Sequence, residues 1–356
     1  DFKAKRVDGK FDYIFTQVVE HLHSEGFVSL KTQYIDGTKI ESAANKYSFV
    51  WRGSVEKSDK RLREKVGTIL KEIESVICVE EQEDFKDSFE PLSTEDFKNR
   101  VERISRKIAE DNDCSKDVKK HIRQIKEESI PKLEKYEEHL NTMGERNSYS
   151  KTDSDATFMR MKEDAMKNGQ LKPAYNVQIS TENQIITNYG IYQRPGDTAT
   201  LIPYLKTFEQ RYGVHSETIV ADSGYGSEQN YEYMIDNNMT PFVKFNMFHV
   251  ENKSKFKNNP FLPQNLYYDK EGNYLICPMG QKIKFIGRKK NVSDMGYVSY
   301  LDVYQAQNCK GCNMRALCHK SEGNRRIELN PKLNSYKQIA RDLLTSEKGL
   351  YHRSMR

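Results

Sequence analysis

Apolar residues recur at helical spacing near the start of the chain. They predict a helix over residues 11–26 with one apolar face, made by Phe11, Ile14, Phe15, Val18, Val19 and Leu22. Residues 32–35 are β-prone and predict a strand. Residues 39–51 fit either a second short strand or an irregular crossing.

A long block rich in Lys, Glu, Asp and Arg follows, from about residue 54 to residue 144. Ser93 and Asp96 resemble a helix-start box, and Pro131 is expected to kink or restart a helix. Apolar residues in the block keep helical spacing: Phe97, Val101, Ile104 and Ile108, then Val118, Ile122, Ile125, Leu133, Tyr136 and Leu140. We predict an inserted helical hairpin or small bundle, because a disordered charged linker, the alternative, would not keep this period.

The pattern after residue 147 is that of a sheet covered by helices. It predicts strands over residues 175–180, 184–192, 218–221 and 241–246, the first two forming a hairpin. It predicts helices over residues 198–212 and 227–237. Asp153 and Asp155 are expected to cap a further helix over residues 156–168. Since parallel strands need helical crossovers, we expect an α/β fold with a mixed sheet flanked by helices.

These patterns divide the chain into five segments. We predict a core interrupted by an all-helical insertion and by a small cysteine-containing insertion. The core would occupy residues 1–53, 147–246 and 331–356, the last being helical, and the insertions would occupy residues 54–146 and 247–330. Strand-like runs at residues 273–277 and 282–286 fall in the second insertion.

Composition says more about the compartment in which the protein is expected than about its function. The 356 residues include 57 Lys and Arg against 52 Asp and Glu, a net charge of +5. This mild excess permits nucleic-acid binding without requiring it. No apolar run approaches the roughly 20 residues of a membrane span, and six cysteines are too few for a disulfide scaffold in a chain this long. We expect no membrane partner and a reducing cytoplasm.

Two aspartates are the main candidates for chemistry, and each is expected at the end of a strand. Asp36 follows the first β-prone run and precedes Gly37, and Asp222 follows the run at 218–221, two residues before Gly224. A carboxylate at such a turn can reach a metal ion, and Mg²⁺ prefers hard oxygen ligands. A pair of acids therefore suggests a two-metal site for phosphodiester cleavage. The alternatives are an Asp-Gly turn at Asp36 and a helix N-cap at Asp222.

Four of the six cysteines lie in the predicted second insertion: Cys277, Cys309, Cys312 and Cys318. Two ligands separated by two residues, with others nearby, fit a closed tetrahedral zinc site, which is structural rather than catalytic. The alternative is reduced thiols in a small core, and His319 could replace one ligand. The other two cysteines, Cys78 and Cys114, are expected to pack inside the helical block.

Basic residues supply candidate phosphate contacts, with solvated surface as the alternative. Such contacts would position DNA without reading its sequence. The candidates are Lys39, Lys253, Lys255, Lys257, Arg288, Lys289, Lys290, Arg325 and Arg326.

With the two aspartates placed on the first and fourth strands of this order, the chain resembles the DDE transposases of bacterial insertion sequences. It is similar to the branch with a helical insertion after the first aspartate and a cysteine-bearing insertion before the last acid. The resemblance covers nearly the whole chain, and its most specific segments are residues 34–41, 45–51, 153–156, 172–178 and 221–226. It implies an RNase H-like fold in which Asp36 is the first acid and Asp222 the second.

The resemblance also implies a third acid, a glutamate just past a segment rich in Tyr and Arg. Residues 351–356 match that segment, and Tyr351, Arg353 and Arg356 become candidate DNA contacts. The glutamate is expected a few residues beyond Arg356, so the chain as given is expected to be inactive by itself. Glu347 is the nearest acid, but it precedes the segment.

The function implied by this resemblance is cleavage of double-stranded DNA at the ends of an insertion sequence. The freed 3′-hydroxyl would then attack target DNA in the same site. Two Mg²⁺ or Mn²⁺ ions are implied, with Asp36 bridging both and Asp222 holding one. A homodimer on DNA is expected, in the bacterial cytoplasm at the nucleoid. The alternatives are an inactive remnant that only binds DNA or intact transposase, and a stand-alone RNase H-like nuclease.

Overall fold

The computed structural model describes residues 3–76, 92–110, 115–161 and 169–355. It divides into two compact units, one made of Asp1–Thr38 with Asn176–Arg356 and the other of Lys39–Tyr175. These units cut the chain at other places than the five predicted segments. Two strands, β1 (Thr32–Glu41) and β5 (Leu171–Glu182), run from one unit into the other.

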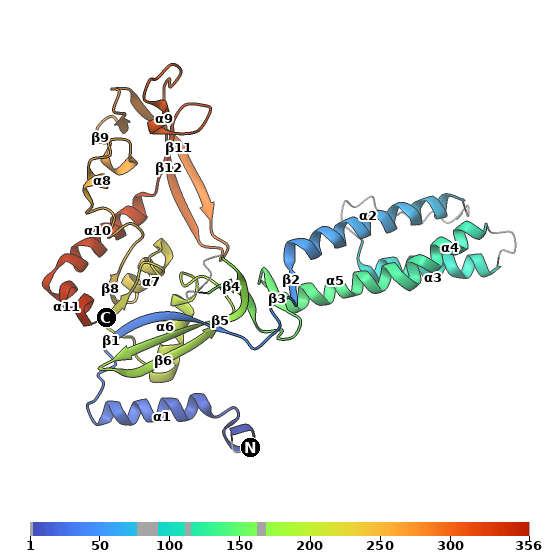
Figure 1. Ribbon diagram of the computed structural model, residues 1–356. Coiled ribbons are helices and arrows are strands. Elements are labelled where there is room, and N and C mark those ends of the chain that lie inside the picture. Colours follow the sequence, from blue (N-terminus) through green and yellow to red (C-terminus); the bar gives the residue numbers. More distant parts are fainter. Residues whose placement is uncertain (1–2, 77–91, 111–114, 162–168, 356) are drawn as a thin grey trace. The chain divides into compact units, whose positions relative to one another are not determined.

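The first unit is built on a mixed sheet (Figure 1). Besides β1 and β5 it contains β6 (Ile185–Tyr192), β7 (Thr218–Ala221) and β8 (Thr240–Val243). Their order is β6-β5-β1-β7-β8, so the first strand of the chain lies in the middle. β7 runs parallel to both β1 and β8, whereas β6 is antiparallel to β5. The predicted mixed sheet is confirmed, and this arrangement is compatible with an RNase H-like fold.

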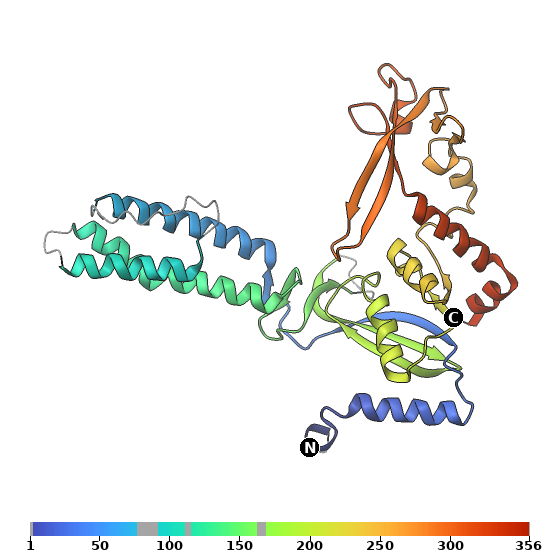
Figure 2. The same ribbon diagram turned by 180° about the vertical axis from the view of Figure 1, so that it is seen from behind.

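Helices flank this sheet, as Figure 2 shows from behind. They are α1 (Phe11–Ser24), α6 (Leu201–Tyr212), α7 (Glu228–Asp236), α10 (Pro331–Thr345) and α11 (Glu347–Met355), and a short π-helical turn, Lys3–Val7, precedes α1. α6 packs against β6, and α7 and α10 pack against β8. The core between helices and sheet includes Ile35, Tyr204, Ile219, Tyr231 and Phe245, none more than 1% exposed. The helices predicted around residues 198–212 and 227–237 are confirmed.

The hairpin between β5 and β6 forms where the sequence predicts it. Its two turn residues, Asn183 and Gln184, have φ of 49° and 68°. Two successive positive φ angles are those of the type I′ turn, whose twist matches the flanking strands. Asn adopts such angles readily, whereas Gln does so at some cost.

A second sheet in the same unit is entirely antiparallel and has the order β13-β12-β11-β10-β9. Its strands are β9 (Tyr267–Asp269), β10 (Tyr274–Ile276), β11 (Lys282–Val292), β12 (Val298–Ala306) and β13 (Arg326–Leu329). Short helices accompany it: α8 (Ser254–Lys257), a 3₁₀ turn at Pro263–Asn265, and α9 (Arg315–Cys318). The strands expected at residues 273–277 and 282–286 are both present, and β11 runs six residues further than predicted.

The second unit is mainly helical. It contains α2 (Arg52–Val76), α3 (Thr94–Glu110), α4 (Lys116–Gln124), a π-helical turn at Ile125–Ser129, and α5 (Ile130–Met143). Apolar residues spaced three and four apart form its core, including Leu70, Phe97, Ile125 and Leu133. Pro131 lies in the first turn of α5, so it restarts the helix as predicted. Short strands complete the unit: β2 (Phe49–Trp51), β3 (Ser148–Ser150) and β4 (Thr157–Arg160), which pairs with the first residues of β5.

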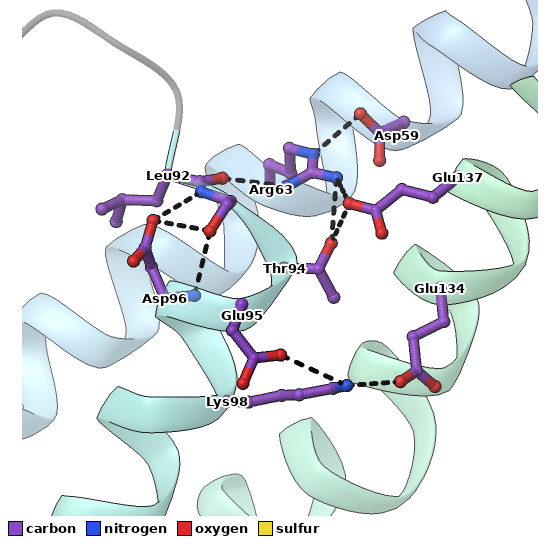
Figure 3. Close-up of polar contacts among 10 residues, drawn as sticks. Asp59, Arg63, Leu92, Thr94, Glu95, Asp96, Lys98, Glu134 and Glu137 are labelled. Atoms are coloured by element: carbon purple, nitrogen blue, oxygen red, sulfur yellow. Dashed lines mark hydrogen bonds and ion pairs between the residues drawn. The ribbon is translucent and has the colours of Figure 1, made fainter. Parts of the chain in front are cut away.

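A charged network joins three helices of this unit around Arg63 (Figure 3). The Arg63 guanidinium donates to Asp59 at 2.8 Å, to the Leu92 carbonyl at 2.8 Å and to Glu137 at 2.9 Å. The predicted helix-start box is also present. Asp96 accepts from the backbone N–H of Ser93 at 2.9 Å, and its own N–H donates to the Ser93 hydroxyl at 3.1 Å. Tertiary ion pairs therefore assist the apolar core in joining α2, α3 and α5.

The network predicts a small acid sensitivity of the helical unit. Burial opposes the charge of Glu137, but hydrogen bonds from Thr94 and Arg63 outweigh it and lower the pKa of this carboxyl below its usual 4.5. The stability it contributes is present above pH 4.5 and is lost as pH falls through the lower folded value. Because the side chain is half exposed, Glu137→Gln is expected to cost at most about 1 kcal/mol at pH 7 and less near pH 3.5. Thermal unfolding of both chains at the two pH values measures this, and a pH-independent difference would contradict it.

Three expectations from the sequence are wrong. Asp36 does not end a strand, because β1 continues through it to Glu41. No helix starts after Asp155, because residues 157–160 form β4 and pair with β5, while residues 162–168 lie outside the described residues. The single helix expected over residues 331–356 is two helices that meet at Ser346. The packing predicted for Cys78 and Cys114 also falls outside the described residues.

Candidate functional site

The register of the central strands brings Asp36 and Asp222 onto neighbouring positions. In the parallel pair β1 and β7, Tyr34 lies opposite Val220. Two residues further along each strand are Asp36 and Asp222, one within β1 and the other directly after β7. Neighbouring strands are about 4.8 Å apart, and residues in register point to the same face. The 185 positions between these two residues in the sequence are therefore bridged by a single step across the sheet.

Each aspartate accepts a hydrogen bond from the backbone of a nearby glycine. The Asp36 carboxylate accepts from the backbone N–H of Gly37 at 2.9 Å, and the Asp222 carboxylate accepts from that of Gly224 at 2.8 Å. Asp36 is exposed and Asp222 half-buried. Ligands of open α/β sheets bind outside the carboxyl ends of the parallel strands, which is where Asp222 lies.

A third carboxylate, Asp197, lies beside Asp222. A Cβ atom built on Gly224 would be 3.0 Å from Asp222 Oδ1 and 3.3 Å from Asp197 Oδ2. Asp222 Oδ1 and Asp197 Oδ2 both lie close to this one position. The distance between the two oxygens is therefore no more than 3.0 plus 3.3 Å. Asp197 lies in the turn that leads into α6, where its carbonyl accepts from the Thr200 N–H at 3.0 Å.

Buried amides hold Asp197 in place. Its Oδ1 accepts from Asn176 at 2.9 Å and from Gln178 at 3.1 Å, and both amide side chains are fully buried in β5. Tyr225, three residues after Asp222, donates its hydroxyl to Gln178. Buried polar groups of this kind have no freedom to turn without losing hydrogen bonds. The network therefore fixes a carboxylate next to the two strand-borne acids.

Gly37 lets the same network approach β1 closely. A Cβ at this position would lie 2.5 Å from the Gln178 amide nitrogen, so only glycine fits without moving that side chain. The residue after Asp36 and the residues that hold Asp197 thus touch each other. Sequence reasoning assigned this glycine to a turn, whereas it is a contact residue inside a strand.

A cationic pocket opens on the other side of Asp222. It has a volume of about 350 Å³ and is lined by Val220, Ala221, Asp222, Phe242, Lys244, Leu344 and Arg353. Lys244 follows β8 and Arg353 lies in α11. The helix is positioned by His352, which stacks on Phe242 and bonds Tyr34 at 2.9 Å. Burial lowers the pKa of His352, which favours a neutral ring in this contact.

The oxygen donors suit a hard divalent cation. Asp36, Asp222 and Asp197 offer carboxylates of the type that Mg²⁺ prefers. Among the residues described, no three His, Cys, Asp or Glu side chains already stand in the arrangement of a metal site. A cation bound by these carboxylates would therefore require side-chain movements from the arrangement described.

The remaining predicted contacts lie elsewhere. Lys39, further along β1, donates to the Arg160 carbonyl at 2.9 Å. Arg288, Lys289 and Lys290 are exposed on β11, and the first two pair with Asp302 at 2.7 Å and Glu328 at 3.4 Å. Tyr351 is exposed on α11, whereas Arg356 lies outside the described residues.

Asp153, the other acid singled out in the sequence, has a structural place in the second unit. It accepts from the Ser42 hydroxyl at 2.5 Å and from the Tyr175 hydroxyl at 2.8 Å. The hydrogen bond from Ser42 outweighs burial and lowers the pKa of this carboxyl, so it stays charged. Asp153 thus joins the segment after β1 to β5 rather than capping a helix.

Sequence reasoning missed Asp197, Lys244 and the two amides. One signal was present: Asn176 and Gln178 alternate with apolar residues inside a strand, at positions that the sheet buries. Polar residues on the buried face of a strand need partners, so a hydrogen-bonding side chain was to be expected opposite them. Nothing local marked Asp197 as that partner, since 19 positions separate it from Gln178.

Close packing at Gly226 is expected to keep the loop after β7 in place. A Cβ there would lie 2.4 Å from the Lys244 carbonyl oxygen and 3.0 Å from Phe245 Cα, both backbone atoms that cannot swing away. Gly226→Ala is therefore expected to destabilise the protein by about 1–3 kcal/mol. Gly67→Ala is the matched control, because Gly67 lies within α2 with nothing within 4 Å of its Cβ, and alanine favours a helix by about 1 kcal/mol. Thermal unfolding of both variants measures this, and an unchanged Gly226→Ala midpoint would contradict the close contact.

The fold and the paired acids are those of an α/β protein of RNase H-like type, with one carboxylate within a parallel strand and another directly after its neighbour. Comparison with protein families adds one finding. Residues 276–356 match the family model of the transposase DDE domain. Over this segment, the match confirms the resemblance to the DDE transposases. The bacterial insertion-sequence branch stays a prediction, as do the roles of Asp36 and Asp222, which lie outside the matched segment. No curated protein matches the chain.

The DDE transposases that this segment resembles act on DNA with divalent metal ions. Within the described residues no helix has the length and apolar character to cross a membrane.

Proposed function

We propose that the chain is the catalytic part of an insertion-sequence transposase, which cleaves DNA at the element's ends and joins the freed 3′-hydroxyl to target DNA. The observation that carries this proposal is the register of β1 and β7, which sets Asp36 and Asp222 side by side. Two carboxylates on adjacent strands can bind the same cation or pair of cations. The match of residues 276–356 to the transposase DDE domain supports the choice of substrate.

In this proposal Asp36 would be a ligand of both Mg²⁺ or Mn²⁺ ions, and Asp222 would be a ligand of one of them. Such a pair of ions, when bound, activates the attacking oxygen and stabilises the leaving oxygen of a phosphodiester. The chain's own groups then have two tasks. The carboxylates hold the cations, and the Lys244 and Arg353 side chains, which line the pocket beside Asp222, attract the DNA phosphates.

A third acid has two candidates. The resemblance implies a glutamate near the Tyr- and Arg-rich segment, and α11, which carries most of that segment, contacts β1 and β8 through His352. Asp197 is a candidate within the described residues, since its carboxylate lies beside Asp222 and is fixed by Asn176 and Gln178. We propose that Asp197 orients the metal site, whether or not a glutamate completes it.

The partners follow from the same proposal. Double-stranded DNA would contact Arg288, Lys289 and Lys290 on β11, and Tyr351 and Arg353 on α11. Two copies of the chain would act together on the two ends of an element, in the bacterial cytoplasm.

The test is cleavage by the full-length protein of a plasmid that carries its gene with the flanking DNA. New 3′-hydroxyl ends at fixed flanking positions, and their joining to a second plasmid, are expected with Mg²⁺ or Mn²⁺ and not with a chelator. Binding without cleavage under every metal condition would favour the inactive, DNA-binding alternative. Cleavage without joining would favour a stand-alone nuclease.

A further inference from the structure

The four cysteines of the antiparallel sheet gather at one place although they come from three separate segments. Cys277 follows β10, Cys309 and Cys312 follow β12, and Cys318 ends α9. All four line a single pocket, together with His319 and Arg325. All four are free thiols, and each is half-buried. Cys277 and Cys318 are 41 positions apart in the sequence, and the fold brings all four cysteines to the same pocket.

Tight turns present the sulfurs to the pocket. After Cys277, Gly280 has φ 77° and donates its N–H to the Cys277 carbonyl at 2.8 Å. Between Cys309 and Cys312, Gly311 has φ 75°. These are backbone angles that glycine adopts freely and other residues rarely. Two short glycine-containing turns, each with a cysteine at its start, face each other.

Backbone and side-chain N–H groups point at the sulfurs. Gln281 N–H donates to Cys277 Sγ, Arg325 N–H to Cys309 Sγ, and the Arg325 guanidinium to Cys318 Sγ, each at 3.3 Å. Arg325 is only 5% exposed, so its positive charge is committed to this pocket rather than to a DNA phosphate. Cys277, Cys309 and Cys318 therefore each accept a hydrogen bond from an N–H group at the edge of the pocket.

His319 adds an independent observation. Its Nδ1 bonds the Ser321 hydroxyl at 2.7 Å, while its Nε2 is buried with no hydrogen-bond partner among the described residues. A buried ring nitrogen without a partner is costly unless something else occupies its lone pair. When Nδ1 carries the proton and donates to Ser321, Nε2 is left as a lone-pair donor, as in histidines that ligate metals.

The size of the pocket selects the ligand. The cavity has a volume of about 30 Å³, which suits one small ion. In the described part of the chain the cysteines do not already stand as a group that could hold a metal ion. Closure around an ion would require the sulfurs to move, and rotation about a side-chain bond takes a sulfur from one staggered position to another.

We propose that this pocket binds one structural Zn²⁺ through Cys277, Cys309, Cys312 and Cys318, with His319 Nε2 able to replace one of the sulfurs. Four ligands of these types would close the coordination sphere and leave no position for substrate, so the ion would act on stability alone. It ties together the ends of β10, β12 and α9, from which the β11–β12 hairpin extends. The hairpin that carries Arg288, Lys289 and Lys290 is thereby anchored at its base.

Metal analysis of the full chain tests this proposal. Protein purified without chelator, or refolded with zinc, is expected to hold one zinc per chain. Cys309→Ser and Cys312→Ser are expected to lose it, whereas the control variants Cys78→Ser and Cys114→Ser keep it. Cobalt(II) in place of zinc is expected to show the visible bands of tetrahedral thiolate coordination, a readout that does not depend on DNA cleavage.

Two results of the metal analysis would overturn the zinc proposal. Zinc near zero after refolding with the metal, or an unchanged zinc content in Cys309→Ser, would overturn the proposal. Where Cys309→Ser fails to fold, the cobalt spectrum of the unmodified chain still decides, because it reports sulfur ligation directly. Since the catalytic cations are proposed on oxygen ligands in the other sheet, failure here would leave the proposed transposase activity untouched.

Discussion

Replacing Asp222 or Asp36 with asparagine is expected to abolish DNA cleavage while leaving the protein folded. Each substitution keeps the shape of the side chain and removes one negative charge from the pair that the register of β1 and β7 brings together. A metal site contributes several kcal/mol to the stabilisation of the transition state. A loss of 4 kcal/mol lowers the rate about 10³-fold, and the plasmid cleavage assay with the full-length protein measures it.

The matched control for this pair is Asp294→Asn. Asp294 is an exposed aspartate in the turn between β11 and β12, with no assigned role. The Asp294→Asn variant is expected to cleave DNA at the rate of the unmodified protein. A loss of cleavage in the other two variants would then be specific to positions 36 and 222. Cleavage retained within tenfold in both Asp36→Asn and Asp222→Asn would remove the catalytic assignment, and with it the reason to propose metal at these strands.

Replacing Asp197 with asparagine is the second large expected effect. The amides of Asn176 and Gln178 would lose their carboxylate acceptor, and the charge beside Asp222 would disappear. Groups that orient a metal site typically contribute 10- to 100-fold in affinity or activity. We therefore expect a cleavage rate lower by about that factor and a shift of the Mg²⁺ titration to higher concentration.

The Mg²⁺ titration distinguishes a role at the metal from a structural one. A variant that merely loosened the start of α6 would cleave more slowly at every Mg²⁺ concentration, with an unchanged midpoint. Gln178→Glu provides a further comparison, because it keeps a side chain of the same size and places a second carboxylate where an amide now donates to Asp197. An unchanged Mg²⁺ midpoint in Asp197→Asn would show that Asp197 acts on the fold and not on the cations.

Local patterns predicted most elements because each depends on neighbours in sequence. The period of Phe97, Val101 and Ile104 predicted the buried face of α3, and Ser93 with Asp96 predicted its start. The hairpin of β5 and β6 and helices α6 and α7 were found in the same way. Predictions failed where a strand partner decided the outcome: residues 157–160 form a strand because β5 is available to pair with them.

The residues of the candidate site also fall into two groups, those identified from the sequence and those that only tertiary contacts reveal. Two aspartates near β-prone runs could be identified from the sequence and assigned to a metal by resemblance. Their place within and after parallel strands, and the carboxylate of Asp197 beside them, depended on partners up to 186 positions away. Lys244 carried no local signal, and Arg325 was assigned from the sequence to DNA phosphates rather than to the cysteines. The pocket at Asp222 and the cysteine cluster exist only after β8 and β13 have paired.

By itself, the order of residues determined the helices with regular apolar spacing, the tight turns, and the kinds of side chain available for chemistry. These follow from backbone preferences and burial over a few residues. Only the tertiary structure decided which acids share an edge of the sheet and which thiols share a pocket. Strand register is the physical reason, because it sets side chains from distant segments about 5 Å apart through hydrogen bonds that no local pattern encodes.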